Sequence, residues 1–391
     1  MDDLDKRIDG ILADVVEWRH DLHAHPELAF EERRTATFIA ERLASFGLEV
    51  QTGLAGTGVV GVLRNGNGPA IGMRADIDAL PIVEATGLPY ASKHAGRMHA
   101  CGHDGHTAML LGAARILAEG TAPRGTFVFI FQPAEESEGG GRVMVEQGLF
   151  TRFPVDAVYG AHNWPGLPCG EFAVHAGPVM AAFDIFEAII EGKGSHGAMP
   201  HQGIDPITIG AQLQTAWQTI VSRAVNPTDP AVISVTQVHA GDAWNVIPDK
   251  LVLRGTVRSF DPKLRDLLEA KMTQRAEMIC AAFDARCRFT YTRRYPATIN
   301  SATEAETARR AAARVAGQEH VVTDRPPSMA AEDFAFMLEQ KPGAYIWMGN
   351  GPDDDGRNLH SPHYDFNDAV LPHGIRYWVR LAETTSVEAA A

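Results

Sequence analysis

Apolar residues recur at two different spacings along the chain, and the spacing changes with position. The first 47 residues carry apolar side chains at a helical period, and a second helical stripe covers residues 107–117. Short apolar runs closed by turn residues predict strands at 70–73, 126–131, 157–160 and 344–348. Strands that alternate with helices predict an α/β fold, in which helices cover both faces of a mostly parallel sheet.

The middle of the chain shows a different order of elements. The pattern strand-helix-strand occurs twice between residues 183 and 293. The predicted strands are 183–192, 231–238, 250–259 and 286–293, and the predicted helices are 206–225 and 261–282. We therefore predict an inserted α+β sandwich domain at 183–293, which leaves 1–182 and 294–391 for the α/β domain.

Composition limits which binding partners and which cellular location are expected for the protein. The 391 residues carry a net charge of −14, which argues against nucleic acid or an anionic membrane as the main partner. The acidic amino terminus shows no secretory signal, and no stretch approaches the roughly 18 apolar residues of a membrane span. Four scattered cysteines favour a cytoplasmic location. Among them, Cys280 and Cys287 lie seven apart in a helical pattern and are predicted to be inert.

Candidate chemistry follows directly after the predicted strands. Asp76 and Asp78 come after the first strand, Glu135 and Glu136 after the second, and His162 after the third. A polar loop after the fourth strand leads to His360. Ligands of open α/β sheets bind outside the carboxyl ends of the strands, so these separate segments are expected to meet in one crevice.

The segment 98–106, with sequence MHACGHDGH, holds the densest cluster. In an extended segment, Cys101 and His103 would point to the same face. A thiolate and an imidazole suit zinc or a similar transition metal. Two other interpretations stay open, namely a cysteine nucleophile paired with histidine and a histidine-rich loop that only caps a helix.

Two adjacent carboxylates diverge, so Glu135 and Glu136 are expected to take separate roles. One can bind metal while the other takes a proton from water. The set of possible ligands has five members: Cys101, His103, Glu136, His162 and His360. Five ligands, one of them shared, give two three-ligand metals with room for water, which favours a two-metal hydrolytic site.

Four longer motifs stand in order along the chain: RADIDALP at 74–81, MHACGHDGHTA at 98–108, FQPAEE at 131–136 and GSHGAMPH at 194–201. They resemble the aminoacylase and carboxypeptidase family of two-metal amidohydrolases. The branch they are most similar to contains hippurate hydrolases, N-acyl-L-amino-acid amidohydrolases and plant indole-acetyl-amino-acid hydrolases. The likeness runs from His25 to Asp368 and so covers nearly the whole chain.

The resemblance implies a role for each of these residues. Glu135 would be the general base, His103 and His162 would bind one metal, Glu136 and His360 the other, and Cys101 would bridge them. The wider family usually has an aspartate at the bridging position and a histidine ligand in the segment matching 76–78, so Asp76 and Asp78 are expected to orient a ligand instead. Two divalent ions are implied, zinc or manganese, with nickel or cobalt as further options.

The resemblance also assigns the inserted domain to the family's lid, through which a homodimer is expected to form. His196 would stabilise the oxyanion of the tetrahedral intermediate, often at the partner's site. Asn245 and Arg258, thirteen residues apart at strand ends, match positions that bind the substrate carboxylate. The planar guanidinium of arginine suits that task, although a surface ion pair is the alternative for Arg258.

The sequence therefore predicts hydrolysis of a small-molecule N-acyl amino acid to a carboxylate and a free amino acid. A carboxypeptidase or an N-acetyl-diaminopimelate deacetylase is the alternative enzyme. A non-catalytic metal or ligand binder on the same fold is a third possibility, against which the presence of Glu135 argues.

Overall fold

The computed structural model describes residues 3–136, 138–352 and 357–388, and the chain forms two compact units. The larger unit comprises Met1–Val179, Ile299–Pro326 and Asp333–Ala391, and the smaller unit comprises Met180–Thr298 and Pro327–Glu332. The second segment of the smaller unit was not foreseen. This late segment is joined to the start of the smaller unit by hydrogen bonds. The Ala181 amide donates to the carbonyls of Ser328 (3.1 Å) and Ala330 (2.9 Å).

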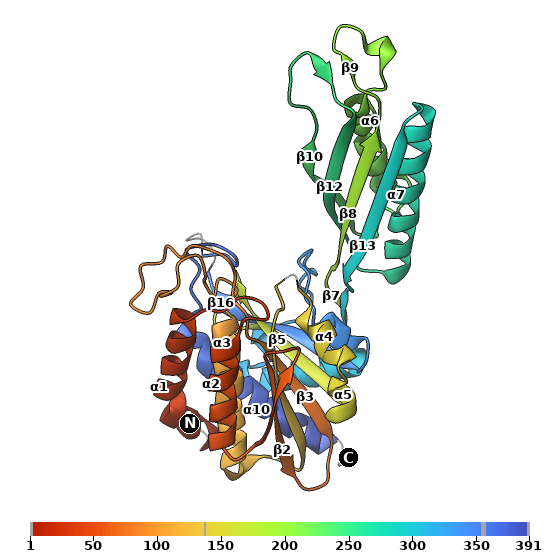
Figure 1. The fold of residues 1–391 in the computed structure, drawn as a ribbon. Helices are drawn as coiled ribbons and strands as arrows, with labels where there is room; N and C mark the ends of the chain where they lie inside the picture. Colours follow the sequence, from red (N-terminus) through yellow and green to blue (C-terminus); the bar gives the residue numbers. More distant parts are fainter. Residues whose placement is uncertain (1–2, 137, 353–356, 389–391) are drawn as a thin grey trace. The chain divides into compact units, whose positions relative to one another are not determined.

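Eight of the described strands form the sheet of the larger unit, in the order β1-β2-β4-β3-β5-β16-β6-β15 (Figure 1). Their bounds are β1 (Glu49–Leu54), β2 (Gly58–Asn65), β3 (Ala70–Asp76), β4 (Gly125–Gln132), β5 (Ala157–Pro165), β6 (Phe172–Ala173), β15 (Val321–Val322) and β16 (Gly343–Gly351). The central strands β4, β3, β5 and β16 pair in parallel. This confirms the predicted α/β class and mostly parallel sheet, to which an antiparallel β1-β2 hairpin is added at one edge.

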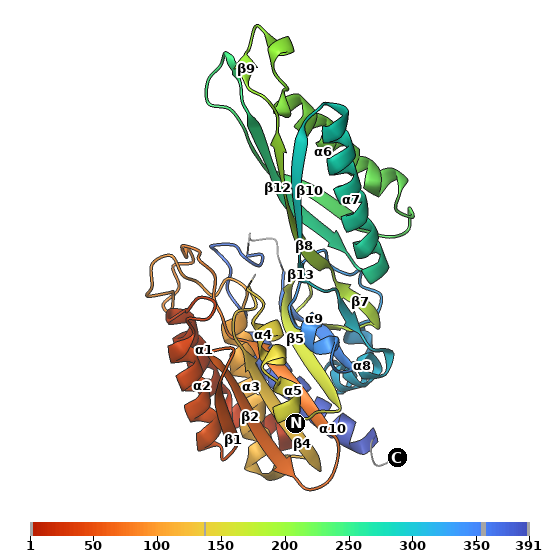
Figure 2. The same ribbon diagram turned by 45° about the vertical axis from the view of Figure 1, so that its right-hand side comes forward.

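Helices pack against this sheet in two groups (Figure 2). The first group is α1 (Asp3–Ala24), α2 (Arg33–Ser45), α3 (His103–Ile116), α8 (Ala302–Ala316) and α10 (Leu371–Glu388), and the second is α4 (Gly140–Glu146), α5 (Leu149–Arg152) and α9 (Ala335–Leu338). Strand β4 shows that both faces are covered. Phe127 and Phe129 join the core that includes α3, whereas Val128 and Ile130 are buried on the opposite face.

The smaller unit is an antiparallel sheet with two helices. Its strands β8 (Ala182–Glu191), β10 (Ala231–His239), β12 (Lys250–Ser259) and β13 (Arg286–Tyr295) lie in the order β10-β12-β8-β13, with α6 (Pro206–Arg223) and α7 (Pro262–Ala282) packed on the sheet. Both helices begin with proline after an aspartate cap. The carboxylate of Asp205 accepts a hydrogen bond from the Ile207 amide, and that of Asp261 accepts one from the Lys263 amide.

The remaining elements are short. They are β7 (Gly177–Met180), β9 (Ser195–His196), β11 (Val246–Ile247), β14 (Thr298–Asn300) and the single turns η1 (Leu117–Thr121), η2 (Pro200–Gln202), η3 (Gln318–His320) and η4 (Asp368–Val370). Within the described residues, no helix combines the length and the apolar character needed to cross a membrane.

One local prediction was wrong. Cys280 lies near the end of α7, but Cys287 is the second residue of β13, so the two do not share a helix. The helix ends at Ala282, and Asp284 takes a positive φ of 56°, which turns the chain back into the strand.

Candidate metal centre

The parallel order of β3, β4, β5 and β16 brings their carboxyl ends to one edge of the sheet. Asp76 is the last residue of β3, Gln132 the last of β4, and His162 lies three residues before the end of β5. The side chains that the sequence placed after separate strands therefore share this edge, as expected for an open α/β sheet.

The segment that precedes α3 brings Cys101 and His103 together by a turn rather than by an extended strand. Gly102 has a φ of 90°, a left-handed value that favours glycine, and His103 is the first residue of the helix. The Nδ1 atom of His103 donates a hydrogen bond to the Asp78 carbonyl at 2.9 Å. Its Nε2 atom is buried and has no hydrogen-bond partner among the described residues, so it is available to a ligand.

His162 faces the Cys101 thiol from β5. Its Nε2 atom lies 3.3 Å from Cys101 Sγ, while its Nδ1 atom donates to the Asn163 carbonyl at 2.5 Å. The carbonyl contact fixes which ring nitrogen carries the proton and leaves Nε2 as the ring nitrogen available to a metal ion.

Glu136 and His360 form a second pair close to Cys101. The Glu136 amide donates to the Asp78 carboxylate at 2.9 Å, and the His360 amide donates to the Ala100 carbonyl at 2.7 Å. These backbone contacts bring His360 Nε2 to 3.1 Å from Glu136 Oε1. Asp78 thus contacts both His103 and Glu136.

The ligand atoms form two groups that share Cys101. The first group is Cys101, His103 and His162, and the second is Cys101, Glu136 and His360, with the atoms of each within 4.8 Å of one another. Glu135 is grouped with His103 and Glu136 by the same criterion. Each group offers three ligands, which leaves open positions on a bound ion.

The electrostatics of the cluster favour a cation. Burial and the Glu136 and Glu135 carboxylates raise the pKa of the Cys101 thiol. Although burial lowers it, the Asp76 carboxylate and its neighbours raise the pKa of His103 to about 10. Burial lowers the pKa of His162 well below its usual range. The donor set therefore fits soft or borderline divalent ions, whose charge would stabilise the thiolate and replace the proton on His103.

The Asp76 carboxylate forms its hydrogen bonds with residues that are not among the predicted ligands. Its carboxylate accepts a hydrogen bond from Arg74 Nη1 at 2.7 Å and lies 2.6 Å from His106 Nδ1. All three residues are buried. His106 and Asn163, which bonds to it, were not among the predicted site residues.

The three predicted residues of the smaller unit lie at two different places in it. His196 on β9 pairs with Val246 of β11, and the Asn245 carbonyl accepts a hydrogen bond from Gly197 at 2.7 Å. Arg258 lies near the far end of β12, with its guanidinium 4.2 Å from the centre of the Phe183 ring. Its Nη1 atom has no hydrogen-bond partner among the described residues, in contrast to an arginine held in a surface ion pair.

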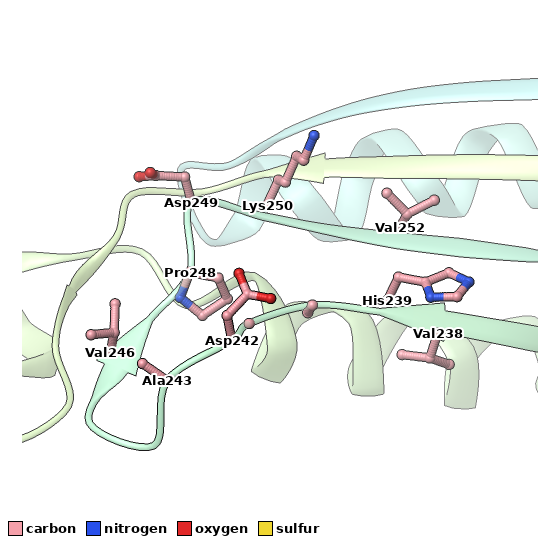
Figure 3. Close-up of a pocket in the computed structure, with 11 residues that line it drawn as sticks. Val238, His239, Asp242, Ala243, Val246, Pro248, Asp249, Lys250 and Val252 are labelled. Atoms are coloured by element: carbon pink, nitrogen blue, oxygen red, sulfur yellow. The ribbon is translucent and has the colours of Figure 1, made fainter.

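We call the segment around β9 and β11 the tip of the smaller unit. A pocket of about 790 Å³ opens there, lined by residues that include Asp242, Asp249 and Lys250 (Figure 3). None of the predicted site residues lines it.

The sequence matches Peptidase family M20/M25/M40 over residues 72–384. It is 42% identical over 370 residues to the N-acetyl-L-cysteine deacetylase of Bacillus subtilis, covering 94% of this chain and 85% of the relative. The chain belongs to the M20/M25/M40 peptidase family. It is therefore a hydrolase. This confirms the resemblance to two-metal amidohydrolases that the four sequence motifs indicated.

Other members of the family are similar over nearly their full length. The hippurate hydrolase of Campylobacter jejuni is 41% identical, with 93% of this chain and 94% of the relative covered. A crystal structure of a dinuclear metal-binding M20 peptidase from Bacillus subtilis is similar with a TM-score of 0.85 and 37% identity. That likeness covers 97% of this chain and 99% of the other.

Proposed function

We propose that this M20-family hydrolase cleaves the amide bond of an N-acyl amino acid, releasing a carboxylate and a free amino acid. The observation that carries the proposal is the pair of ligand groups that share Cys101, with Glu135 beside them. The relatives named as a deacetylase of N-acetyl-L-cysteine and as a hippurate hydrolase support this substrate class.

In this proposal each ligand group holds one divalent ion. Cys101, His103 and His162 would hold the first, and Cys101, Glu136 and His360 the second. When bound, the two ions would polarise the substrate carbonyl and make water acidic enough to attack near neutral pH. A thiolate with imidazoles favours zinc, whereas manganese, nickel and cobalt are the alternatives for the cation.

The chain's own groups would move the protons. The Glu135 carboxylate accepts a proton from the attacking water and delivers it to the leaving nitrogen. His196 donates a hydrogen bond to the oxyanion, and Arg258 binds the substrate carboxylate through its planar guanidinium. The contact with the Phe183 ring orients the guanidinium, and its buried Nη1 atom is a donor without an acceptor among the described residues, as expected of a group that binds a ligand.

The positions of these residues in the smaller unit support a homodimer. Lys250 adjoins the tip that carries His196 and Asn245, and Arg258 lies eight residues further along β12, roughly 26 Å away at the rise of a strand. One small substrate cannot contact both ends of the same unit. We therefore propose that the tip of one subunit serves the substrate held by Arg258 of the other.

Two features of the tip and of the chain add support. Trp244, next to Asn245, is fully exposed, as expected for a tryptophan that is covered in an assembly.

The four cysteines are free thiols, which fits the proposed cytoplasmic location.

A carboxypeptidase is the second candidate. The thermostable carboxypeptidase 1 of Saccharolobus solfataricus is 37% identical over 384 residues, only slightly less than the deacylating relatives. An N-acetyl-diaminopimelate deacetylase would use the same groups. Cleavage of N-acyl amino acids and of carboxy-terminal peptide bonds differs only in the acyl part of the substrate.

The test is release of free amine from a panel of N-acetyl, N-benzoyl and indole-acetyl amino acids and short peptides. Each substrate is assayed before chelation, after chelation and after a divalent ion is restored. We expect activity on N-acyl amino acids that is lost on chelation and regained with metal. Activity that survives chelation and is lost on alkylation would assign the chemistry to Cys101 as a nucleophile, and preference for peptides would favour the carboxypeptidase.

A further inference from the structure

Asn163 is a buried polar residue directly after His162 on β5, and its exposed fraction is 0%. A buried polar residue in a strand this apolar must satisfy its hydrogen-bonding atoms locally. Asn163 contacts groups around the candidate metal centre through both its backbone and its side chain.

The side-chain amide of Asn163 connects two other segments. Its Nδ2 atom donates to the Cys101 carbonyl at 2.6 Å, and its Oδ1 atom accepts from the Tyr364 hydroxyl at 2.8 Å. The Asn163 backbone carbonyl accepts from His162 Nδ1. One residue therefore contacts both Cys101 and His162, whose ligand atoms lie 3.3 Å apart.

The backbone amide of Asn163 is hydrogen-bonded to the side chain of His106. This amide donates to His106 Nε2 at 2.9 Å, so that nitrogen is an acceptor and the ring proton is on Nδ1. His106 Nδ1 then donates to Asp76 Oδ1 at 2.6 Å. Both nitrogens of His106 are occupied, so His106 anchors Asn163 to β3 rather than serving as a ligand.

The contact also explains the glycine between the two predicted ligands Cys101 and His103, at the start of α3. A Cβ atom on residue 102 would lie 2.4 Å from Asn163 Nδ2 and 2.4 Å from the Tyr364 hydroxyl. Both distances are shorter than real Cβ atoms tolerate. Gly102 thus leaves room for the Asn163 amide to reach the Cys101 carbonyl.

We propose that Asn163 is a positioning residue that sets the distance and orientation between Cys101 and His162. The proposal rests on the proposed function, because it concerns the ligands of the same site. Loss of the amide would leave every ligand in place but free the Cys101 backbone to move. Groups that orient metal ligands typically contribute 10- to 100-fold to metal affinity.

The test is a titration of the metal-free protein with Co²⁺, followed by the thiolate-to-cobalt charge-transfer absorption. Asn163→Ala removes the side-chain contacts with the Cys101 carbonyl, the Tyr364 hydroxyl and His106 Nε2. Tyr364→Phe removes only the hydroxyl that orients the amide. We expect Asn163→Ala to weaken cobalt binding at one site by roughly 10- to 100-fold and to shift the charge-transfer band. Tyr364→Phe should change both in the same direction by a smaller amount.

Tyr377→Phe is the matched control, since the Tyr377 hydroxyl is buried without a hydrogen-bond partner among the described residues. It should bind cobalt like the wild type. Wild-type cobalt affinity and spectrum in Asn163→Ala would overturn the proposal, and if that variant does not fold, an unchanged Tyr364→Phe protein would overturn it. A wild-type protein that binds no metal would instead refute the proposed function.

Discussion

At the scale of single residues, substitutions of the two adjacent glutamates are expected to have different effects on turnover and on metal content. Glu135→Gln keeps the shape of the side chain but cannot accept a proton. We predict that turnover falls by at least about 100-fold while both metal ions stay bound, because Glu135 is assigned no metal. The measurement is kcat together with the metal content of the same sample.

Glu136→Gln provides the contrast to this variant. Its carboxylate lies with Cys101 and His360 in one ligand group, so this protein should lose metal as well as activity. Near-normal turnover of Glu135→Gln, or metal loss in both variants alike, would contradict the assignment of Glu135 as the base.

Arg258 is expected to affect substrate binding more than chemistry. Arg258→Lys retains a positive charge but loses the planar fork that can bind both carboxylate oxygens. We predict a KM raised by roughly 10-fold with kcat changed little, as for an interaction made equally in the ground and transition states. A fall in kcat with unchanged KM would place Arg258 in the chemical step instead. N-acyl amines that lack the carboxylate are the control, since they should not distinguish the variant from the wild type.

Single residues also show where sequence reasoning ends. The donor types were enough to name five residues, which the structure brings into two groups: Glu136, His162 and His360 from their places after strands, and Cys101 and His103 from the dense segment 98–106. Asn163 could have been noticed only as a polar residue within an apolar strand. Apart from the adjacent His162, its partners lie 57, 62 and 201 residues away, so nothing local indicates them.

At the scale of elements, a buried charge pair joins α1 to α3. His23 Nδ1 lies 2.8 Å from Asp104 Oδ2, and both side chains are inaccessible to solvent. Although burial lowers it, the Asp104 carboxylate raises the pKa of His23 to about 9. A pKa raised on folding adds stability that is complete below the unfolded pKa of about 6.5 and is lost as the pH rises through about 9.

We therefore predict that His23→Gln destabilises the protein more in acid than in base. The difference in the free energy of unfolding between variant and wild type should be about 3 kcal/mol larger near pH 6 than near pH 9.5. Urea denaturation at the two pH values, with equal metal, measures it. His320→Gln is the control because His320 is half exposed, 3.5 Å from Glu171, and should change stability little at either pH. A His23→Gln effect independent of pH would contradict the prediction.

The sequence predicts a helix or strand most readily where the buried positions form a regular pattern or a run of apolar residues. The runs at β3, β4, β5 and β16 are buried almost throughout, and each was recognised as a strand. Strand β1 was missed because most of its residues are exposed, so no apolar run marks it. Asn245 and Arg258 were expected at neighbouring strand ends. Asn245 instead directly precedes β11 at the tip, whereas Arg258 is the second-last residue of β12, because a separation in sequence does not give the direction of a strand.

At the scale of the whole molecule, the proposed dimer predicts that two inactive variants restore activity together. Glu135→Gln removes the proposed base of the larger unit, and His196→Ala removes the proposed oxyanion donor at the tip of the smaller unit. If the tip of one subunit serves the other's site, a heterodimer of the two variants contains one site with both groups intact. If each subunit used its own tip, every site in the heterodimer would lack one group.

We expect the heterodimer, isolated by two different affinity tags, to have about half the activity of the wild-type dimer. Each homodimer, purified in the same way, should be nearly inactive and serves as the control. A heterodimer as inactive as its parents would show that each tip serves its own subunit, and a monomeric mass in solution would remove the dimer itself. In either case Arg258 and His196 would have to approach one substrate by a change within the chain, which the length of β12 makes difficult.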